Sequence, residues 1–503
     1  MLKLGKISEA VFTVGLFSVF TRILSFIFKI YLSRTLGAEV IGLYQIATSV
    51  FFLFASFSSS GLPLVLSRKT AQDIALGENK YKGYFSSALF IGISISMLVI
   101  MVIWTFSNSL GFLFSDKNAI PIFFIMLPAL LSTTIYGIIR GFLWGNKQFL
   151  AFSATETVEE LLRIVFSVML ISGVLFKLDG KTAIAIAFTA SDMIVAIILI
   201  IIFFVKSGKI SRPCQLKDIF TPSIPITSMR IFSSMIATLI AIILPLKLLD
   251  FGMSASEATA SYGRIAGMAN PLLLAPNALI SSLAIVLIPE MSANGIKKEY
   301  NKLNQHLTNG INLSLLISGL FVVIYLSLGE EITTLLYKDS ISGQYLSVAC
   351  VVMIPMCISQ LTQSALNSMG KEFRSFFNYL FGNIVMIIAI FILPPYIGIY
   401  SVAVATLLCL LITSICNVVS LHKITKGRIN CTKNLLLITA FIIPCALICE
   451  WLNNIMIMQL GALSVIISCV ISIGLYFVLC FGFKLIDIKG FVHLKKVKAN
   501  PVS

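Results

Sequence analysis

The sequence predicts an all-α polytopic membrane protein, and composition is the main reason. Of the 503 residues, 58% are hydrophobic and only 12% are charged, whereas soluble domains are about half apolar and a quarter charged. A membrane-spanning helix needs about 20 apolar residues, so about 14 such helices would occupy about 60% of the chain. Little sequence is left for a separate soluble domain.

Apolar runs bounded by polar breaks divide the chain into about 14 candidate transmembrane helices. They are expected at 8–32, 39–64, 83–106, 119–144, 155–176, 182–205, 219–246, 258–289, 307–328, 344–368, 376–393, 398–420, 434–453 and 459–483. The first run follows Lys3 and Lys6 and continues to Tyr31. It is too long for the apolar core of a signal peptide, so we expect it to be retained. An even number of spans places both termini on one side of the membrane.

The distribution of Lys and Arg residues predicts on which side of the membrane the termini lie. Of the 37 Lys and Arg residues, 25 lie on the side of the termini, six lie on the opposite side and six lie within spans. Because cytoplasmic loops are enriched in Lys and Arg, both termini are predicted to be cytoplasmic, in a bacterial plasma membrane. The net charge of +16 then follows from topology, and no nucleic-acid partner is expected.

Weak similarity between the two halves, at an offset near 225 residues, predicts an internal repeat of six helices. Gly145-Asn146-Lys147 corresponds to Gly370-Lys371-Glu372, and Gly61-Leu62-Pro63 corresponds to Ile288-Pro289. Repeats of six helices share one orientation, which predicts two parallel bundles, as in alternating-access transporters. The predicted domains are an N-terminal lobe, residues 1–218, a C-terminal lobe, residues 219–433, and a final helix pair with a basic cytoplasmic tail, residues 434–503. The alternative is that Gly, Pro and Lys recur at helix ends by chance.

A polar stripe crosses the otherwise apolar first helix. Ser18, Arg22, Ser25 and Lys29 follow one another at spacings of four, three and four, which places them on one face. Two cations on one face favour a water-filled cavity that receives an anion, and a guanidinium and an ammonium suit phosphate. The alternative is structural: Lys29 snorkels to the interface and Arg22 pairs within the protein.

The second half offers further candidates for substrate binding. Arg264 opens the eighth predicted helix, and the same helix carries Asn270 and the prolines Pro271 and Pro276. Prolines inside a span mark a kinked helix whose freed carbonyl groups face a cavity or a neighbouring helix. Arg230 in the seventh helix is another candidate, and its alternative role is a buried ion pair.

The start of the fifth predicted helix suggests a gate. Glu156, Glu159, Glu160 and Arg163 lie on one side of it near the cytoplasmic end. Acids favour helix N-termini, and Glu159 with Arg163 is an ordinary i,i+4 pair, so part of this pattern is structural. The functional hypothesis is that these carboxylates bind Arg140 in one conformational state and release it in another.

Asp192 lies in the middle of the sixth predicted helix. An ionisable residue at this depth is a functional candidate, here for coupling to a proton or Na⁺. A hydrogen bond that packs two helices together is the alternative, and it is the commoner role of such groups.

No residue pattern predicts catalysis, a metal site or a cofactor. All ten cysteines lie at or after Cys214, without C-x-x-C spacing, and they fit small residues of a membrane core. His306, His422 and His493 are far apart in polar connections, so neither a zinc site nor a histidine-based catalytic site is expected.

Several motifs together resemble a known family. They are Thr21-Arg22-Ile23-Leu24-Ser25-Phe26, Leu32-Ser33-Arg34-Thr35-Leu36-Gly37, Gly42-Leu43-Tyr44, Gly61-Leu62-Pro63, Arg140-Gly141 with Gly145, and Glu159 to Arg163. With them the chain resembles the stage V sporulation protein B group of polysaccharide exporters, within the multidrug/oligosaccharidyl-lipid/polysaccharide flippase superfamily. The resemblance covers essentially the whole chain and includes Arg264.

The resemblance implies a two-lobed fold of fourteen helices that flips an undecaprenyl-linked precursor, lipid II or a relative, for the spore cortex. In the related lipid II flippases, arginines on the first, second and eighth helices line a central cavity. Arg22 and Arg264 match that pattern. Lys29 lies one position after the corresponding arginine, and the second helix has no basic residue. Helices 13 and 14 would form a groove for the lipid tail.

The expected partners are a lipid-linked oligosaccharide, the bilayer and cell-wall synthesis enzymes. Two other functions remain open: a cation-coupled drug or metabolite antiporter of the same fold, which predicts a cavity dominated by carboxylates, and a membrane scaffold for wall synthesis that transports nothing. A channel is disfavoured because the sequence contains no filter-like repeat.

Overall fold

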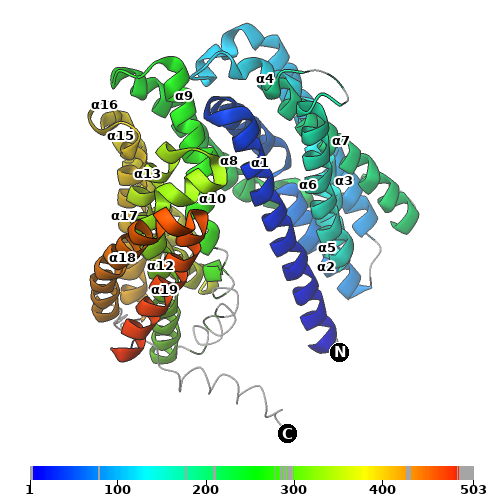
Figure 1. Cartoon of the computed structure of the whole chain (residues 1–503). Coiled ribbons are helices and arrows are strands. Elements are labelled where there is room, and N and C mark those ends of the chain that lie inside the picture. The colour runs from blue at the N-terminus through cyan, green and yellow to red at the C-terminus, as the bar shows by residue number, and fades with distance from the viewer. Residues whose placement is uncertain are drawn as a thin grey trace. The chain divides into compact units, whose positions relative to one another are not determined.

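The computed structural model describes the chain as helices with short connections, and no strand occurs among the residues it describes (Figure 1). Those residues are 4–77, 80–174, 176, 178–207, 211–213, 215–277, 279–281, 283, 287, 291, 297, 299–425, 432–483 and 485. The chain divides into two compact units, Met1–Gly267 and Met268–Ser503. The predicted all-α membrane fold is confirmed.

The first helix, α1 (Leu4–Ser59), contains the first predicted span and most of the second, which was expected to end at residue 64. Its 56 residues would extend about 84 Å, far more than the roughly 30 Å of a bilayer core. Gly37 interrupts it with φ 77° and ψ 173°, a region of backbone conformation that is essentially restricted to glycine. A break at a single glycine therefore takes the place of the expected loop between these two spans. Apolar periodicity does not reveal such a break.

The remaining helices of the first unit follow the predicted order. They are α2 (Leu62–Leu76), α3 (Tyr81–Thr105), η1 (Ser107–Leu113), α4 (Ala119–Met126), α5 (Ala129–Gly145), α6 (Phe149–Ile171), α7 (Gly180–Ser207), α8 (Leu216–Asp250) and α9 (Ala255–Gly263). The span predicted at 119–144 is bent by 47° between α4 and α5. Pro128 lies at this break and lacks the N–H that a continuous helix requires.

After α9, a short π-helical segment, η2 (Arg264–Ala269), leads into the second unit. That unit contains α10 (Asn270–Leu273), α12 (Tyr300–Tyr337), α13 (Ser340–Ala349), η3 (Cys350–Val352), α14 (Met353–Ser368), α15 (Glu372–Ile392), α16 (Pro394–Ile397), α17 (Tyr400–Thr425), α18 (Thr432–Leu460) and α19 (Ala462–Gly482). Most of the predicted eighth span after Asn277, the Ile288-Pro289 pair and the basic tail lie outside the described residues.

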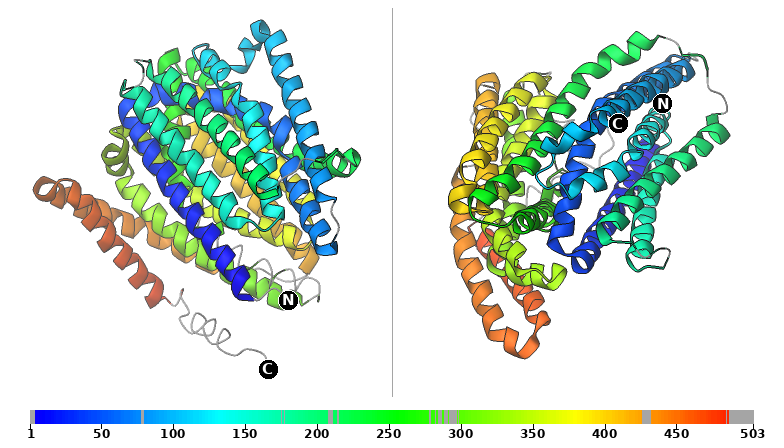
Figure 2. Two further views of the ribbon diagram at one scale, coloured as in Figure 1. Left: turned by 90° about the vertical axis from the view of Figure 1, so that its right-hand side faces the viewer. Right: turned by 90° about the horizontal axis from the view of Figure 1, so that it is seen from above.

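Within the first unit, α1 packs against α6, α8 and α9, while α6 and α5 both pack against α7 (Figure 2). An aromatic cluster fills the space between α3, α5 and α7: the rings of Phe85 and Phe203 stack at 4.1 Å, and Phe142 lies 5.1 Å from Phe85. In the second unit, α15 packs against α17, and α12 packs against α13 and α18. The core of the first unit holds the polar residues of α1, α5, α6 and α7 in fixed positions.

Ten helices of the described chain are long and apolar enough to cross a membrane, or eleven if the bent pair α4–α5 is one span. One of them, Val14–Leu76, has 63 residues and contains the Gly37 break, so it accounts for two predicted spans. The helix α6 is absent from this set although it was predicted as a span. Its charged residues lower its hydropathy, and they form the candidate functional site.

Candidate functional site

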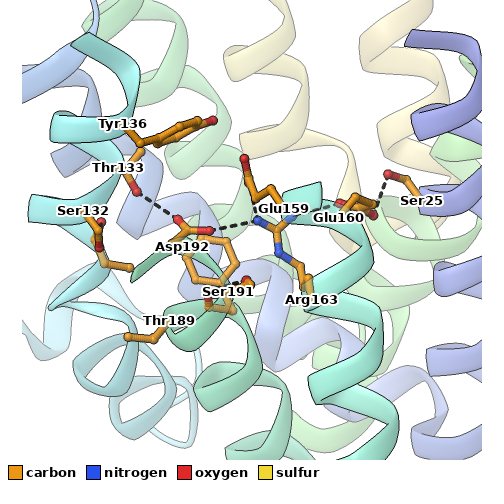
Figure 3. A network of polar contacts seen from close by, with 12 residues as sticks. Ser25, Ser132, Thr133, Tyr136, Glu159, Glu160, Arg163, Thr189, Ser191 and Asp192 are labelled. Atoms are coloured by element: carbon orange, nitrogen blue, oxygen red, sulfur yellow. Dashed lines mark hydrogen bonds and ion pairs between the residues drawn. The ribbon is translucent and has the colours of Figure 1, made fainter. Parts of the chain in front are cut away.

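Arg163 is the centre of a buried ion-pair network between α6 and α7 (Figure 3). Its guanidinium lies 2.6 Å from Glu159, 3.1 Å from Glu160 and 3.1 Å from Asp192. The Asp192 side chain is only 3% exposed, and the hydroxyl of Thr133 on α5 donates to it at 3.0 Å. One cation is thus shared by three carboxylates, which ties α5, α6 and α7 together.

A second ion pair joins α5 to the start of α6. Arg140 donates to Glu156 at 2.9 Å and to the hydroxyl of Tyr136 at 3.1 Å. Its guanidinium also lies 4.3 Å from the centre of the Phe152 ring, in cation–π geometry. Glu156 is half exposed. The pairing that the gate hypothesis requires in one state is therefore present here; its release in another state stays a prediction.

Part of the polar stripe of α1 packs against α6, and part of it does not. Ser25 donates to Glu160 at 2.6 Å, and the hydroxyls of Thr21 and Thr157 lie 2.8 Å apart. Arg22, in contrast, is exposed. The line of contact follows Thr21 and Ser25, so Arg22 falls at the edge of the face that packs.

A cavity of about 240 Å³ lies between α1 and α6 in the first unit. It is lined by Ser25, Phe28, Lys29, Leu32, Ile41, Tyr44, Gln45, Glu160, Arg163 and Gly267. Lys29 makes no direct ion pair with any side chain that the structure describes. The cavity therefore presents an ammonium group beside Glu160, and small polar groups or water can fill it.

The other predicted substrate-binding residues do not line this cavity. Arg22 and Arg230 are exposed, and within the described part of the chain neither has an ion-pair partner. Arg264 is partly buried in η2, and Asn270 opens α10 in the second unit. Of the five candidates, the structure places only Lys29 in the cavity beside the predicted gate.

Of the α5 residues at the site, sequence reasoning identified Arg140 but missed Thr133 and Tyr136, and it also missed the residues from the second half of α1. Thr133 and Tyr136 precede Arg140 at spacings of three and four, a one-face pattern that could have identified them. Tyr44 and Gln45 carry no comparable signal, because the Gly37 break separates them from the polar stripe of the first part of α1. Among the described residues, no group of His, Cys, Asp or Glu side chains is arranged to hold a metal ion.

These features define a multi-pass membrane protein with a charged network buried among its helices. The chain belongs to the polysaccharide biosynthesis protein family, which residues 8–295 match. It is 24% identical to stage V sporulation protein B of Bacillus subtilis (strain 168) over 428 residues, 81% of each chain.

Solved structures show the same fold. The chain is similar to lipid II flippase MurJ in an inward closed conformation, with a TM-score of 0.75 and 16% identity over 93% of this chain and 98% of that one. It is also similar to a multidrug resistance MATE family transporter in an inward-facing conformation, with a TM-score of 0.69 and 14% identity over 81% of this chain and 96% of that one.

Proposed function

We propose that the protein is a flippase that moves an undecaprenyl-linked cell-wall precursor of the lipid II class across the cytoplasmic membrane, for spore cortex peptidoglycan. The observation that carries the proposal is the set of cations Arg22, Lys29 and Arg230, none of which has a direct ion pair among the described residues. Cations in membrane helices are costly unless they face water or an anionic partner. A pyrophosphate–sugar head group is such a partner.

In this mechanism the cations bind the pyrophosphate, the polyprenyl tail stays in lipid, and the protein alternates between two conformations. The Arg140–Glu156 pair closes the cytoplasmic side in one of them. Substrate shifts the two conformations only by its difference in affinity, so direction requires an ion gradient, the membrane potential or consumption of the product. Asp192, held by Arg163 and Thr133, is the proposed coupling carboxylate, and wall-synthesis enzymes are the proposed consumers.

The test is reconstitution of the purified protein in liposomes with fluorescent lipid II. Exposure of the head group on the far leaflet is measured for the wild type and for Arg22→Ala, Lys29→Ala and Arg230→Ala. We expect flipping by the wild type and at least a tenfold loss in each variant, roughly the value of one charge-assisted contact. Arg374→Ala, an exposed cation at the start of α15, is the control. Normal flipping by all three variants would refute the proposal.

The carboxylates around Arg163 favour a second candidate, a cation-coupled antiporter of the same fold. It predicts that the reconstituted wild type exports a cationic dye in exchange for protons or Na⁺ and leaves lipid-linked sugars in place. The same liposomes, loaded with dye, separate the two candidates.

A further inference from the structure

In the second unit, amide side chains follow one face of α14, which ends a candidate membrane span. Gln360, Gln363 and Asn367 recur at spacings of three and four; the first two are half-buried and the third is exposed. The opposite face is buried, and Leu361 and Leu366 lie on it. Because hydrocarbon does not solvate amides, the amide face of α14, defined by these three residues, faces water or a polar ligand.

The amide face leads from the predicted cytoplasmic side toward the middle of the membrane. Asn367 lies at the end of α14, just before Lys371 and Arg374 in a connection that is predicted to be cytoplasmic. Gln360 lies about two helical turns deeper, about 11 Å from Asn367 along the helix axis. An uncharged polar surface thus begins on the side from which the proposed substrate is taken and ends within the membrane.

At the inner end of this face, Gln360 contacts the eighth predicted span. Its side-chain nitrogen donates to the hydroxyl of Ser281 at 2.7 Å, and that hydroxyl donates to the backbone carbonyl of Asn277 at 2.6 Å. Since the single proton of the Ser281 hydroxyl is used on the carbonyl, the hydroxyl can only accept from Gln360. The hydrogen bonds therefore fix the orientation of the Gln360 amide, with its nitrogen toward Ser281 and its oxygen turned away.

Two amide oxygens at this inner end lack a donor. The side-chain oxygens of Gln360 and Asn277 are buried, and neither accepts a hydrogen bond from any group that the structure describes. A buried acceptor without a donor is costly, whereas the same acceptor stabilises a ligand that brings a donor to it. These two oxygens are therefore pre-oriented acceptors for a ligand.

The chemistry of these groups selects a neutral ligand rich in hydroxyl groups. The free atoms are acceptors, so the ligand must donate, as the hydroxyl and N-acetyl N–H groups of a sugar do and phosphate oxygens do not. Gln360, Asn277 and Ser281 carry no charge, so they offer neither the cations that suit phosphate nor the carboxylates that suit a metal ion. The charged cavity of the first unit, with Lys29 and Glu160, has the opposite character.

We propose that the amide face of α14, together with Ser281 and Asn277 at its inner end, is a sugar-binding site. Gln360, Gln363 and Asn277 bind an N-acetylated sugar of the head group, while the cations bind the pyrophosphate. This inference rests on the proposed flippase function and deepens it, because it assigns the sugar of the substrate to residues of its own.

The first test isolates the contribution of the sugar to binding. Purified protein in nanodiscs is titrated with undecaprenyl pyrophosphate and with the same lipid carrying one N-acetylglucosamine. The wild type should bind the glycosylated lipid more tightly. Gln360→Leu should weaken that binding about tenfold, as expected for one or two hydrogen bonds, and leave the affinity for the bare pyrophosphate unchanged.

Gln344→Leu is the matched control, because it removes an exposed amide from α13, outside the amide face. Its affinities for both lipids should equal those of the wild type. Unchanged affinity of a folded Gln360→Leu protein for the glycosylated lipid would overturn the sugar site, as would an equal loss for the two lipids.

A second variant answers the case in which Gln360→Leu does not fold. Gln363 lies one turn nearer the cytoplasm and is half-buried on the amide face, so Gln363→Leu leaves the packed face of α14 intact. It should weaken binding of the glycosylated lipid about threefold and leave the bare pyrophosphate unaffected. Wild-type affinity for the glycosylated lipid in this variant would exclude a site along the amide face.

A soluble sugar separates the site from the proposed substrate. N,N′-diacetylchitobiose, a neutral disaccharide without lipid or phosphate, should bind the wild type and compete with the glycosylated lipid, and Gln360→Leu should lose this binding. Such binding in a protein that flips no lipid-linked sugar would support the site and refute the flippase. Flipping of lipid II by a wild type that binds neither the disaccharide nor the added N-acetylglucosamine would refute the site and leave the flippase standing.

Discussion

Arg163 shows how a single side chain organises a membrane-embedded site. Its three carboxylate partners are 3–14% exposed, so their negative charges are screened mainly by one guanidinium. Removing one partner from such a buried group leaves uncompensated charge, which is far more costly than losing a surface pair. Arg140 is different, because its partner Glu156 is 48% exposed and water can replace the contact.

We therefore expect Arg163→Ala to destabilise the protein by about 3–5 kcal/mol. Arg140→Ala should cost only about 1–2 kcal/mol, from the exposed pair and the cation–π contact. Thermal unfolding of the purified variants in detergent measures both. Equal losses in the two variants would contradict the assignment of Arg163 as the centre of the network.

The sequence allows half of this network to be predicted. Helical spacing alone pairs Arg163 with Glu159 and places Glu160 beside it, since residues three and four apart face each other. Asp192 and Thr133 come from other helices, and no local pattern encodes which helices meet. The same limit explains Arg22: its spacing joins it to Ser25, but the line along which α6 crosses α1 decides which of them is buried.

At the scale of the element, the main departure from expectation is the single-residue break in α1. Apolar runs predicted the long apolar helices of the described chain, ten or eleven of which could cross a membrane, because the need to span about 30 Å of hydrocarbon leaves a strong compositional signal. Runs do not reveal how segments are joined. Gly37, with positive φ, replaces a loop, and Pro128 bends a span that looked continuous.

Gly37→Ala should destabilise the protein by about 1–3 kcal/mol, because a Cβ atom strains a backbone conformation that only glycine adopts freely. Gly15→Ala, at a helical position of α1 with open space around it, should be neutral or stabilise by up to about 1 kcal/mol. The fraction of protein that stays monodisperse after heating, followed by size-exclusion chromatography, compares the two. A tolerated Gly37→Ala would show that this break does not set the fold of α1.

For the whole molecule, the distribution of charge is the strongest prediction available from sequence. The excess of Lys and Arg on one side of the membrane does not depend on the exact ends of any helix, since a shift of a few residues leaves most of the 37 basic residues in the same connections. The division at residues 218 and 433 depends on a weak repeat and stays a prediction. The first compact unit of the structure extends to Gly267 and includes α8 and α9.

Both termini should therefore be cytoplasmic. A fluorescent protein that folds only in the cytoplasm, fused after Ser503, should be bright, and alkaline phosphatase fused at the same point should be inactive. Fusions in the loop at 114–118 should show the opposite pattern. Active phosphatase at the C-terminus would invert the predicted topology.

The charges of α6 also have a consequence for how the protein is made. An acidic or basic residue at the centre of a helix adds about 2.5–3.5 kcal/mol to the cost of insertion, and α6 carries Glu156, Glu159, Glu160 and Arg163. Alone it is a poor substrate for the insertion machinery. During synthesis α1 and α5 precede it, and they supply Ser25, Thr21 and Arg140 as partners. Asp192 emerges only with α7, so the contact between Arg163 and α7 forms after α6 has already met α1 and α5, and the network is complete only when the next helix has been made.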